Sequence, residues 1–353
     1  MPFMHADAAS RVATPVPYSV ARSDDHDTWR TMRLLVTGGC GFIGRNFIRY
    51  ILDHYQPEMI TNVDALTYAS SMRSSVAFSS RFGDRYEFFK ADIADAERMD
   101  EVLSSHSYFA VVNFAAESHV DRSIASPANF IRTNVVGADT LLNAARRHGV
   151  KRFVQVSTDE VYGSLPPTGR FTEQSALNPS SPYSASKAAA DLLVLAAYKT
   201  YGQDVVVTRC SNNYGPYQHP AKFIPLVILC ALSDRPLPVY GDGLNVRDWI
   251  HVDDHCAAVF DVLMQGRAGE IYNVGADAER NNLEVINAIL SHLGKGVELI
   301  QFISDRRGHD RRYAIDSSKL RSEIGWKPLY AFERGLLETI DWYRRNESWW
   351  KGV

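Results

Sequence analysis

The segment Thr37-Gly38-Gly39-Cys40-Gly41-Phe42-Ile43-Gly44 follows the apolar run Leu34–Val36 and precedes a segment with helical spacing. Its glycines at 38, 41 and 44 form a Gly-x-x-Gly-x-x-Gly turn. Because glycine has no Cβ atom, the backbone of such a turn can approach a pyrophosphate closely. The free N–H groups and the dipole of the following helix then favour the negative charge. The segment predicts a strand–turn–helix unit that binds a dinucleotide, and a tight turn without a ligand is the weaker alternative.

An acidic residue at the end of the second strand supports the same interpretation. Asp64 follows the β-branched run Ile60–Val63 and lies twenty residues beyond Gly44, where a carboxylate can accept hydrogen bonds from ribose hydroxyls. The next two residues are alanine and leucine rather than an arginine for a 2′-phosphate, so the sequence predicts NAD rather than NADP. Asp92 ends a further apolar run and is a candidate for contact with the adenine, with an ordinary strand-end aspartate as an equal alternative.

Short β-branched runs alternate with helical segments from residue 32 onward. The runs are Leu34–Thr37, Ile60–Val63, Val111–Phe114, Phe153–Val156 and Val205–Thr208, and Phe130–Arg147 has helical periodicity. This alternation predicts an α/β fold with a Rossmann-type, doubly wound parallel sheet. After about residue 210 the spacing becomes irregular and richer in proline and glycine, with helices expected near 252–264, 283–293 and 331–345.

The change of pattern also predicts the domain organisation. Residues 1–31 show neither a sustained apolar period nor a secretory apolar core, which indicates a flexible N-terminal tail. An NAD-binding domain is expected over 32–210, with a returning segment near 245–275. Residues 211–244 and 276–353 are expected to form a smaller C-terminal α/β lobe that binds the substrate.

Composition and charge argue against several classes of protein. The chain has 353 residues, 45% hydrophobic content and a net charge of −3, which suits a globular protein without a basic surface for nucleic acid. Its longest apolar run, Phe223–Leu232, contains Pro225 and is well short of the ~20 residues that span a membrane. The four cysteines are widely spaced and form no metal-binding motif, so no metal site is predicted and reduced thiols in the cytoplasm are expected.

Two adjacent carboxylates follow the run Phe153–Val156. Thr158, Asp159 and Glu160 project at its carboxyl end, the edge at which open α/β sheets assemble their reacting groups. The carboxylates are therefore candidates for proton transfer, whereas a helix cap or a solvent-facing pair is the competing interpretation.

A tyrosine and a lysine four residues apart open a predicted helix that reaches about Tyr201. The spacing of Tyr183 and Lys187 places both side chains on one helical face. A nearby ammonium favours the phenolate and lowers the pKa of a tyrosine, which makes it a usable base near neutral pH. Lys187 can also bind the ribose of the cofactor. A tyrosine and a lysine at this spacing occur by chance on many helices, so the motif indicates catalysis here because the glycine turn accompanies it.

Together these motifs resemble the extended short-chain dehydrogenase/reductases over residues 32 to about 345. Four segments further resemble the dTDP-glucose 4,6-dehydratase family: Ala115–Ser123, Ser157–Gly163, Asn212–Tyr217 and Arg247–Trp249. The resemblance implies an NAD-dependent lyase of deoxysugar biosynthesis that oxidises C4 of a nucleotide-activated glucose, eliminates water across C5–C6 and returns the hydride to C6. It also implies a homodimer through a four-helix contact of the helices around 127–148 and 182–201.

The resemblance implies roles for individual residues. Glu160 corresponds to the base that removes the C5 proton, Asp159 to the acid that protonates the 6-hydroxyl, and Thr158 to the hydroxyl that binds the C4 oxygen. Tyr183 and Lys187 complete the catalytic set. The implied cofactor contacts are Gly38, Gly41, Phe42, Ile43, Gly44, Asp64, Asp92, Ile93, Ala115, Ala116, Thr133, Tyr183, Lys187 and Asn213. The implied substrate contacts are Ser118, Thr158, Asn212, Lys222, Phe223, Pro238, Tyr240, Arg247, Asn282, Asp305, Arg306 and His309.

Some questions stay open at this point. Arg307 stands where the family usually has proline, and an extra cation there either strengthens diphosphate binding or faces water. His119 is expected to be a satisfied structural histidine beside the cofactor. A nucleotide-sugar 4-epimerase of the same superfamily would share the glycine turn and the tyrosine–lysine pair but would have no use for Asp159 and Glu160. A non-catalytic NAD-sensing protein would be expected to lack the tyrosine–lysine pair. The sequence does not separate thymidine from uridine nucleotides.

Overall fold

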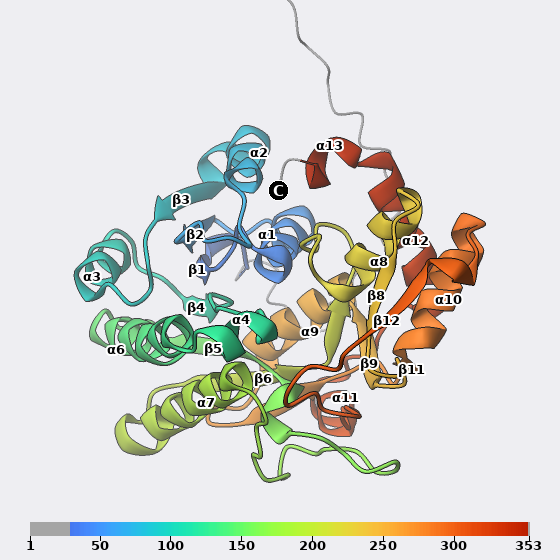
Figure 1. The fold of residues 1–353 in the computed structure, drawn as a ribbon. Helices are drawn as coiled ribbons and strands as arrows, with labels where there is room; N and C mark the ends of the chain where they lie inside the picture. The colour runs from blue at the N-terminus through green and yellow to red at the C-terminus, as the bar shows by residue number, and fades with distance from the viewer. Residues whose placement is uncertain (1–28, 352–353) are drawn as a thin grey trace, which may run out of the picture.

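The computed structural model describes residues 29–351, and its centre is a seven-stranded parallel sheet (Figure 1). The strand order is β10-β6-β5-β4-β1-β2-β3. The bounds are β1 (Arg33–Thr37), β2 (Met59–Asp64), β3 (Tyr86–Lys90), β4 (Ala110–Asn113), β5 (Arg152–Thr158), β6 (Val205–Cys210) and β10 (Ile271–Val274). Because β1 pairs with both β2 and β4, the strand order reverses direction there, as in Rossmann-type sheets. The predicted fold class is confirmed.

Helices cover both faces of this sheet. One face packs against α1 (Phe42–His54) and α9 (Val252–Gln265), the other against α3 (Ala96–Ser104), α6 (Ala138–Arg147) and α7 (Pro182–Tyr201). Along β1, Leu34 and Val36 belong to the first core and Leu35 to the second, because successive side chains of a strand point to opposite faces. Burial on both faces explains why the strands read as continuous apolar runs.

Two smaller sheets and their helices form a second group of elements, coloured yellow to red in Figure 1. One sheet has the order β11-β9-β7 and the other β12-β8. The strands are β7 (Asn212–Tyr214), β8 (Leu237–Tyr240), β9 (Val246–His251), β11 (Glu279–Asn281) and β12 (Ile300–Ile303). The helices are α8 (Phe223–Leu232), α10 (Asn282–Leu293), α11 (Ser318–Ile324), α12 (Phe332–Arg345) and α13 (Glu347–Trp350). A third apolar core joins α8, α10 and α12 around Trp249 and Leu336.

One predicted helix differs from expectation. The segment Phe130–Arg147 is helical, but its first part is the π-helix η3 (Ile131–Gly137), which joins α5 (Ala128–Phe130) to α6. The buried Asn134 side chain accepts a hydrogen bond from Glu117 N (2.8 Å) and donates to Ser186 Oγ (2.9 Å). These tertiary contacts account for the local widening, since π-turns are typical where a side chain serves a site rather than the helix.

The remaining elements are short. They are η1 (Trp29–Thr31), α2 (Met72–Phe82), η2 (Gly83–Arg85), α4 (Val120–Ala125), η4 (Asp159–Tyr162) and η5 (Val297–Leu299). Residues 1–28 of the predicted tail lie outside the described part of the chain. Within residues 29–351, the helices are either too short or too polar to cross a bilayer. All four cysteines are buried and free.

Candidate active site

The glycine turn packs tightly against the loop that follows β4. Gly38 adopts φ +71°, and its N–H donates to Val63 O at 2.8 Å. A Cβ atom on Gly38 would lie 2.7 Å from Ala115 N, and one on Gly44 would lie 2.4 Å from Gly38 O. Only glycine therefore fits at both positions, and Gly41 caps the start of α1.

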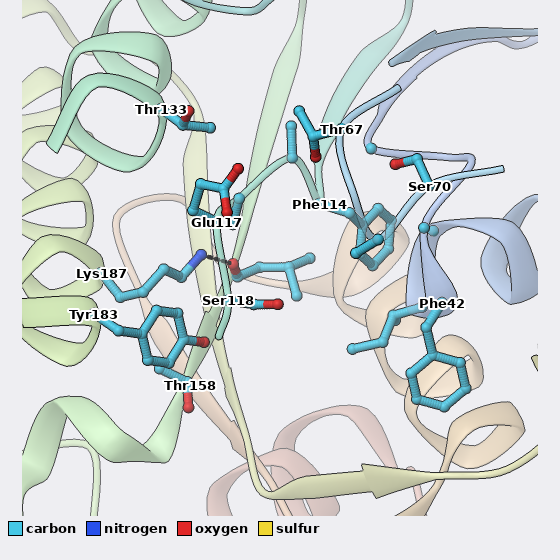
Figure 2. A pocket seen from close by; sticks show the side chains of 18 of the residues that line it. Phe42, Thr67, Ser70, Phe114, Glu117, Ser118, Thr133, Thr158, Tyr183 and Lys187 are labelled. Atoms are coloured by element: carbon cyan, nitrogen blue, oxygen red, sulfur yellow. Dashed lines mark hydrogen bonds between the residues drawn. The ribbon is translucent and has the colours of Figure 1, made fainter. Parts of the chain in front are cut away.

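A cavity of about 470 Å³ runs along the carboxyl edge of the large sheet (Figure 2). Figure 2 shows Phe42 toward one end of this cavity and Tyr183, Lys187 and Thr158 toward the other. Each predicted cofactor residue contributes to its wall: Gly38, Gly41, Phe42, Ile43, Gly44, Asp64, Asp92, Ile93, Ala115, Ala116, Thr133, Tyr183, Lys187 and Asn213. The structure thus brings together residues from several strand ends.

Two aspartates at strand ends are held by the backbone around them. Asp64 Oδ2 accepts the N–H of Cys40 (2.9 Å) and Oδ1 accepts the N–H of Leu66 (2.7 Å). Burial raises the pKa of this carboxyl. Each carboxylate oxygen can accept a second hydrogen bond, which leaves capacity for ribose hydroxyls. Asp92 Oδ1 accepts the N–H of Ala94, and Oδ2 pairs with Arg132 at 2.6 Å. The glycine cradle and the Asp64 carboxylate fit a dinucleotide such as NAD.

The two adjacent carboxylates, Asp159 and Glu160, have different surroundings. Asp159 is 1% exposed, and its Oδ2 has no hydrogen-bond partner in the described part of the chain. Burial, and then the charges of Glu160 and Asp248, raise its pKa well above the usual range. Burial also raises the pKa of Glu160, but the cations Arg247, Arg306 and Lys222 lower it. Burial thus raises the pKa of both carboxyls, more strongly for Asp159, and cations offset part of the effect at Glu160, so Asp159 is the better proton donor of the two and Glu160 the better acceptor.

Thr158 is the N-cap residue of the short helix that contains Asp159 and Glu160. Thr158 ends β5, and its Oγ1 accepts the N–H of Glu160 at 3.2 Å, which starts the short helix η4. Asp159 and Glu160 both line the cavity, where Figure 2 shows Thr158 beside Tyr183.

The helix α7 carries Tyr183 and Lys187. Ser181 forms a capping box with Ser184, and Pro182 occupies the first turn, which explains why the helix begins there. Lys187 Nζ donates to Val156 O at 2.7 Å (Figure 2). Burial, followed by the charge of Glu160, raises the pKa of Tyr183 well above its usual range, while the Thr158 hydroxyl lowers it.

The pKa of Tyr183 therefore differs from the sequence-based expectation, in which Lys187 lowered it. The ammonium of Lys187 is directed at the carbonyl of β5, and burial outweighs any charge that the phenol feels in this geometry.

The predicted substrate residues fall into two groups. Ser118, Asn212 and Lys222 line the cavity together with the catalytic side chains, and Lys222 Nζ donates to Ser118 O at 2.8 Å. Arg247 is buried, and its charge acts on both catalytic carboxylates. Outside the cavity wall lie Phe223, Pro238, Tyr240, Arg247, Asn282, Asp305, Arg306 and His309.

Four of these outer residues form a cluster of their own at the rim. His309 Nδ1 lies 2.6 Å from Asp305 Oδ1, and its ring meets Tyr240 edge-on at 6.1 Å. The Arg306 guanidinium lies 5.7 Å from the Tyr240 ring, and Arg306 also pairs with Asp121 at 3.6 Å. The side chain of Arg307 is exposed.

His119 is not the satisfied histidine that was expected. Its buried Nδ1 has no hydrogen-bond partner among residues 29–351. Burial, followed by the charge of Lys222, lowers its pKa and favours the neutral ring.

Several contributors were not predicted from sequence. Asp248 belongs to the motif Arg247–Trp249, but its effect on the site was not predicted: its charge raises the pKa of Asp159. Asp310 Oδ2 accepts hydrogen bonds from both Ser180 and Tyr313 and so ties the rim cluster to the segment before α7. Asn134 holds the Glu117 backbone. Neither Asn134 nor Asp310 could be identified from a local sequence pattern, because most of their hydrogen-bond partners are distant in the chain.

The chain matches a family model described as GDP-mannose 4,6 dehydratase over residues 35–339. A dTDP-glucose 4,6-dehydratase of Xanthomonas campestris pv. campestris (strain B100) is 51% identical over 337 residues, which cover 90% of this chain and 95% of the relative. The structure of the chain also resembles that of DesIV, a dTDP-glucose 4,6-dehydratase from Streptomyces venezuelae solved with NAD and a dTDP ligand. The two share a TM-score of 0.87 and 48% identity over 91% of this chain and 99% of that chain.

An epimerase also shares the fold. The UDP-glucose 4-epimerase of Thermus thermophilus, in complex with NAD, superposes with a TM-score of 0.82 at 30% identity, over 89% of this chain and 100% of that chain. The backbone alone therefore does not separate the two activities, and the side chains of the site must do so.

We expect Gly38→Ala to weaken NAD binding at least tenfold, because the new methyl group would press on the Ala115 backbone and displace the turn. Binding is measured by titration of the cofactor-free protein with NAD. Gly149→Ala is the matched control: Gly149 has a similar φ of +67° but open space around its Cβ, so only a strain of roughly 1–2 kcal/mol applies. Unchanged NAD affinity in the folded Gly38 variant would contradict the assigned cradle.

Proposed function

We propose, on the premise that this chain belongs to the GDP-mannose 4,6 dehydratase family, that it is a hydro-lyase that converts dTDP-glucose into its 4-keto-6-deoxy derivative with NAD. Relatives of about 50% identity are dTDP-glucose 4,6-dehydratases, and DesIV was solved with NAD and a dTDP ligand. The observation that carries the proposal is the pair of adjacent carboxylates in different environments: the pKa of Asp159 is raised well above its usual range, whereas three cations offset the effect of burial at Glu160.

The chemistry requires such a pair. Elimination of water across C5–C6 is difficult because the C5 proton of a hexose is not acidic. A ketone at C4 makes that proton acidic, so a positioned carboxylate can remove it. NAD⁺, when bound, supplies the acceptor for the hydride that leaves C4 and the donor that returns it to C6.

The residues divide the proton transfers among them. Tyr183 takes the proton of the 4-hydroxyl, and Thr158 holds the C4 oxygen. Glu160, at which nearby cations offset the effect of burial, takes the C5 proton. Asp159, kept protonated by burial and by neighbouring charges, gives a proton to the departing 6-hydroxyl. General acids and bases of this kind typically contribute 10²–10⁴-fold each.

One group opposes the effect of burial on Tyr183, since the Thr158 hydroxyl lowers the pKa of the phenol. This contact favours transfer of the 4-hydroxyl proton to Tyr183. The ammonium of Lys187 lies one turn further along the same face of α7, where it can hold the ribose of the cofactor.

The nucleotide end of the substrate is assigned to the second group of elements. Arg247 and Arg306 both act on Glu160 and carry the charge that a diphosphate needs. Ser118 and Asn212 line the sugar end of the cavity, and the buried Asn212 Oδ1 has no partner in the described chain. Tyr240, Asp305 and His309 complete the rim, with Phe223, Pro238 and Asn282 behind them.

In this proposal the cofactor and the nucleotide sugar are bound by two different domains. We assign residues 32–210, with the returning segment near 245–275, to cofactor binding, because β10 and α9 pack on the large sheet. Residues 211–244 and 276–353 form the nucleotide-sugar lobe in this assignment. The enzyme is expected to work in the cytoplasm with its four cysteines reduced.

The proposed dimer uses the helices around 127–148 and 182–201. These helices contact one another in the monomer and leave large apolar side chains exposed. The exposed side chains are Ile131, Val136, Leu192, Tyr198 and Tyr201. A second copy of the same face would bury them in a four-helix contact, the isologous arrangement typical of homodimers.

Incubation of the purified protein with dTDP-glucose is expected to yield a 4-keto-6-deoxy product without added reductant. The product is identified by mass spectrometry as a loss of one water. UDP-glucose, tested in parallel, reports on the choice of base. A product of unchanged mass with inverted C4 would instead identify a 4-epimerase, and no product from any nucleotide-glucose would refute both activities.

Glu160→Gln is expected to permit oxidation at C4 but to slow elimination by about 10² or more, because the amide cannot take the C5 proton. Reduced nicotinamide should then accumulate on the enzyme, visible by its absorbance. Tyr183→Phe should stop the reaction earlier, without this absorbance. Full turnover by the Glu160 variant would show that another group is the C5 base.

A further inference from the structure

A buried ion pair lies next to the catalytic residues but is not among them. Asp191 on α7 is 0% exposed and Arg209 on β6 is 2% exposed, and Arg209 Nε donates to Asp191 Oδ2 at 2.9 Å. Burying both charges is costly, and such a pair rarely adds net stability compared with apolar residues of the same size. Its position suggests another use.

The pair joins the two segments that carry the catalytic side chains. Asp191 lies one turn beyond Lys187 on the same helix. Arg209 is paired in register with Ser157, the residue before the catalytic trio. Its guanidinium also lies 4.8 Å from the ring of Tyr162, the last residue of the turn η4 that holds Asp159 and Glu160. One arginine therefore contacts both the catalytic helix and the catalytic turn.

Anchors on both sides keep this arrangement rigid. Lys187 Nζ is bound to Val156 O, one residue before Ser157, so α7 is attached to β5 directly beneath the trio. On the other side, the Tyr162 hydroxyl donates to Asn273 Oδ1 of β10 at 2.8 Å. The link runs from α7 through β6 to the edge of the sheet.

Asp191 follows Lys187 by four residues on α7, and its charge acts on the lysine. The groups that face Lys187 are Asp191 and Cys210, and burial lowers the pKa of the lysine while Asp191 raises it. Asp191 is in turn faced by Arg209, Lys187 and Ser157. The titratable groups that act on Arg209 are Asp191 and Tyr162, and Glu173 in turn acts on Tyr162. The Oδ1 atom of Asp191 has no hydrogen-bond partner among residues 29–351.

We propose that Asp191, held in place by Arg209, is a positioning residue that keeps the buried Lys187 protonated and fixes α7 against the catalytic turn. The benefit to dehydration rests on the proposed function, because it is there that the Lys187 ammonium holds the cofactor. The protonation of Lys187 itself is independent of any substrate.

The direct test is the titration of Lys187 in the holoenzyme. Carbon-13 at lysine Cε reports the charge of each lysine by NMR, and Lys187→Arg identifies the signal. In Asp191→Asn the Lys187 signal is expected to titrate at least one pH unit lower than in the wild type, since an opposite charge within ~4–6 Å shifts a pKa by roughly 1–3 units. The alkaline limb of the kcat profile should move to lower pH by the same amount, with KM for dTDP-glucose changed less than twofold.

Three further variants separate charge from packing. Asp191→Asn leaves Arg209 buried without its partner and can impair folding, so Asp191→Asn combined with Arg209→Gln removes both charges and should show the same shift. Asp191→Glu keeps the charge and should titrate like the wild type. Asp261→Asn is the matched control, because Asp261 is another buried aspartate whose pKa burial raises to about 7, but it lies on α9 across the sheet. It should leave the Lys187 signal unchanged.

The outcomes distinguish the two claims. An unshifted Lys187 signal in folded Asp191→Asn or in the double variant overturns the proposal. Failure of both variants to fold would also overturn it, since the pair would then serve stability alone. If the signal shifts but the wild type does not dehydrate dTDP-glucose, the role of Asp191 stands and the proposed function fails.

Discussion

The close approach of the Gly38 backbone to Ala115 is the constraint on which the site depends. It is possible only because Gly38 lacks a side chain, and it brings the ends of β1 and β4 to one level. A buried ladder of side chains continues this alignment, from Thr37 Oγ1 to Asn113 Oδ1 (2.6 Å) and from Asn113 Nδ2 to Gln155 Oε1 (2.8 Å). As a result β1, β4 and β5 end side by side. The dinucleotide cradle and the catalytic carboxylates then share one cavity (Figure 2).

Within that cavity, burial decides which chemistry each carboxyl group can perform. Asp159 and Glu160 are neighbours in sequence, yet burial raises the pKa of Asp159 further, because Arg306 and Lys222 act on Glu160 in addition to the Arg247 that both share. A difference in environment of this kind separates an acid from a base without any difference in side-chain chemistry. The fold of an epimerase is nearly the same, so this difference, rather than the backbone, is what suits the cavity to elimination.

The sequence was informative wherever local chemistry decides the structure. Alternating runs predicted the sheet, Ser181 and Pro182 at the start of α7 agree with the predicted helix, and the glycine spacing located the cradle. The sequence was less informative where contacts between residues distant in the chain determine the local structure. Asn134 turns part of a regular helix into a π-helix through contacts with Glu117 and Ser186. His119 could not be recognised as unsatisfied, since its neighbours come from other segments. For Tyr183, burial has a larger effect on the pKa than the lysine that the spacing suggested.

The central claim is that oxidation, elimination and reduction occur in succession on one bound sugar. The most direct measurement uses dTDP-glucose carrying deuterium at C4, with the product examined by NMR and mass spectrometry. Because the hydride taken from C4 is held within the same cavity until it is returned, the deuterium should appear at C6 of the 4-keto-6-deoxy product. Deuterium released to the solvent, or retained at C4, would contradict the account.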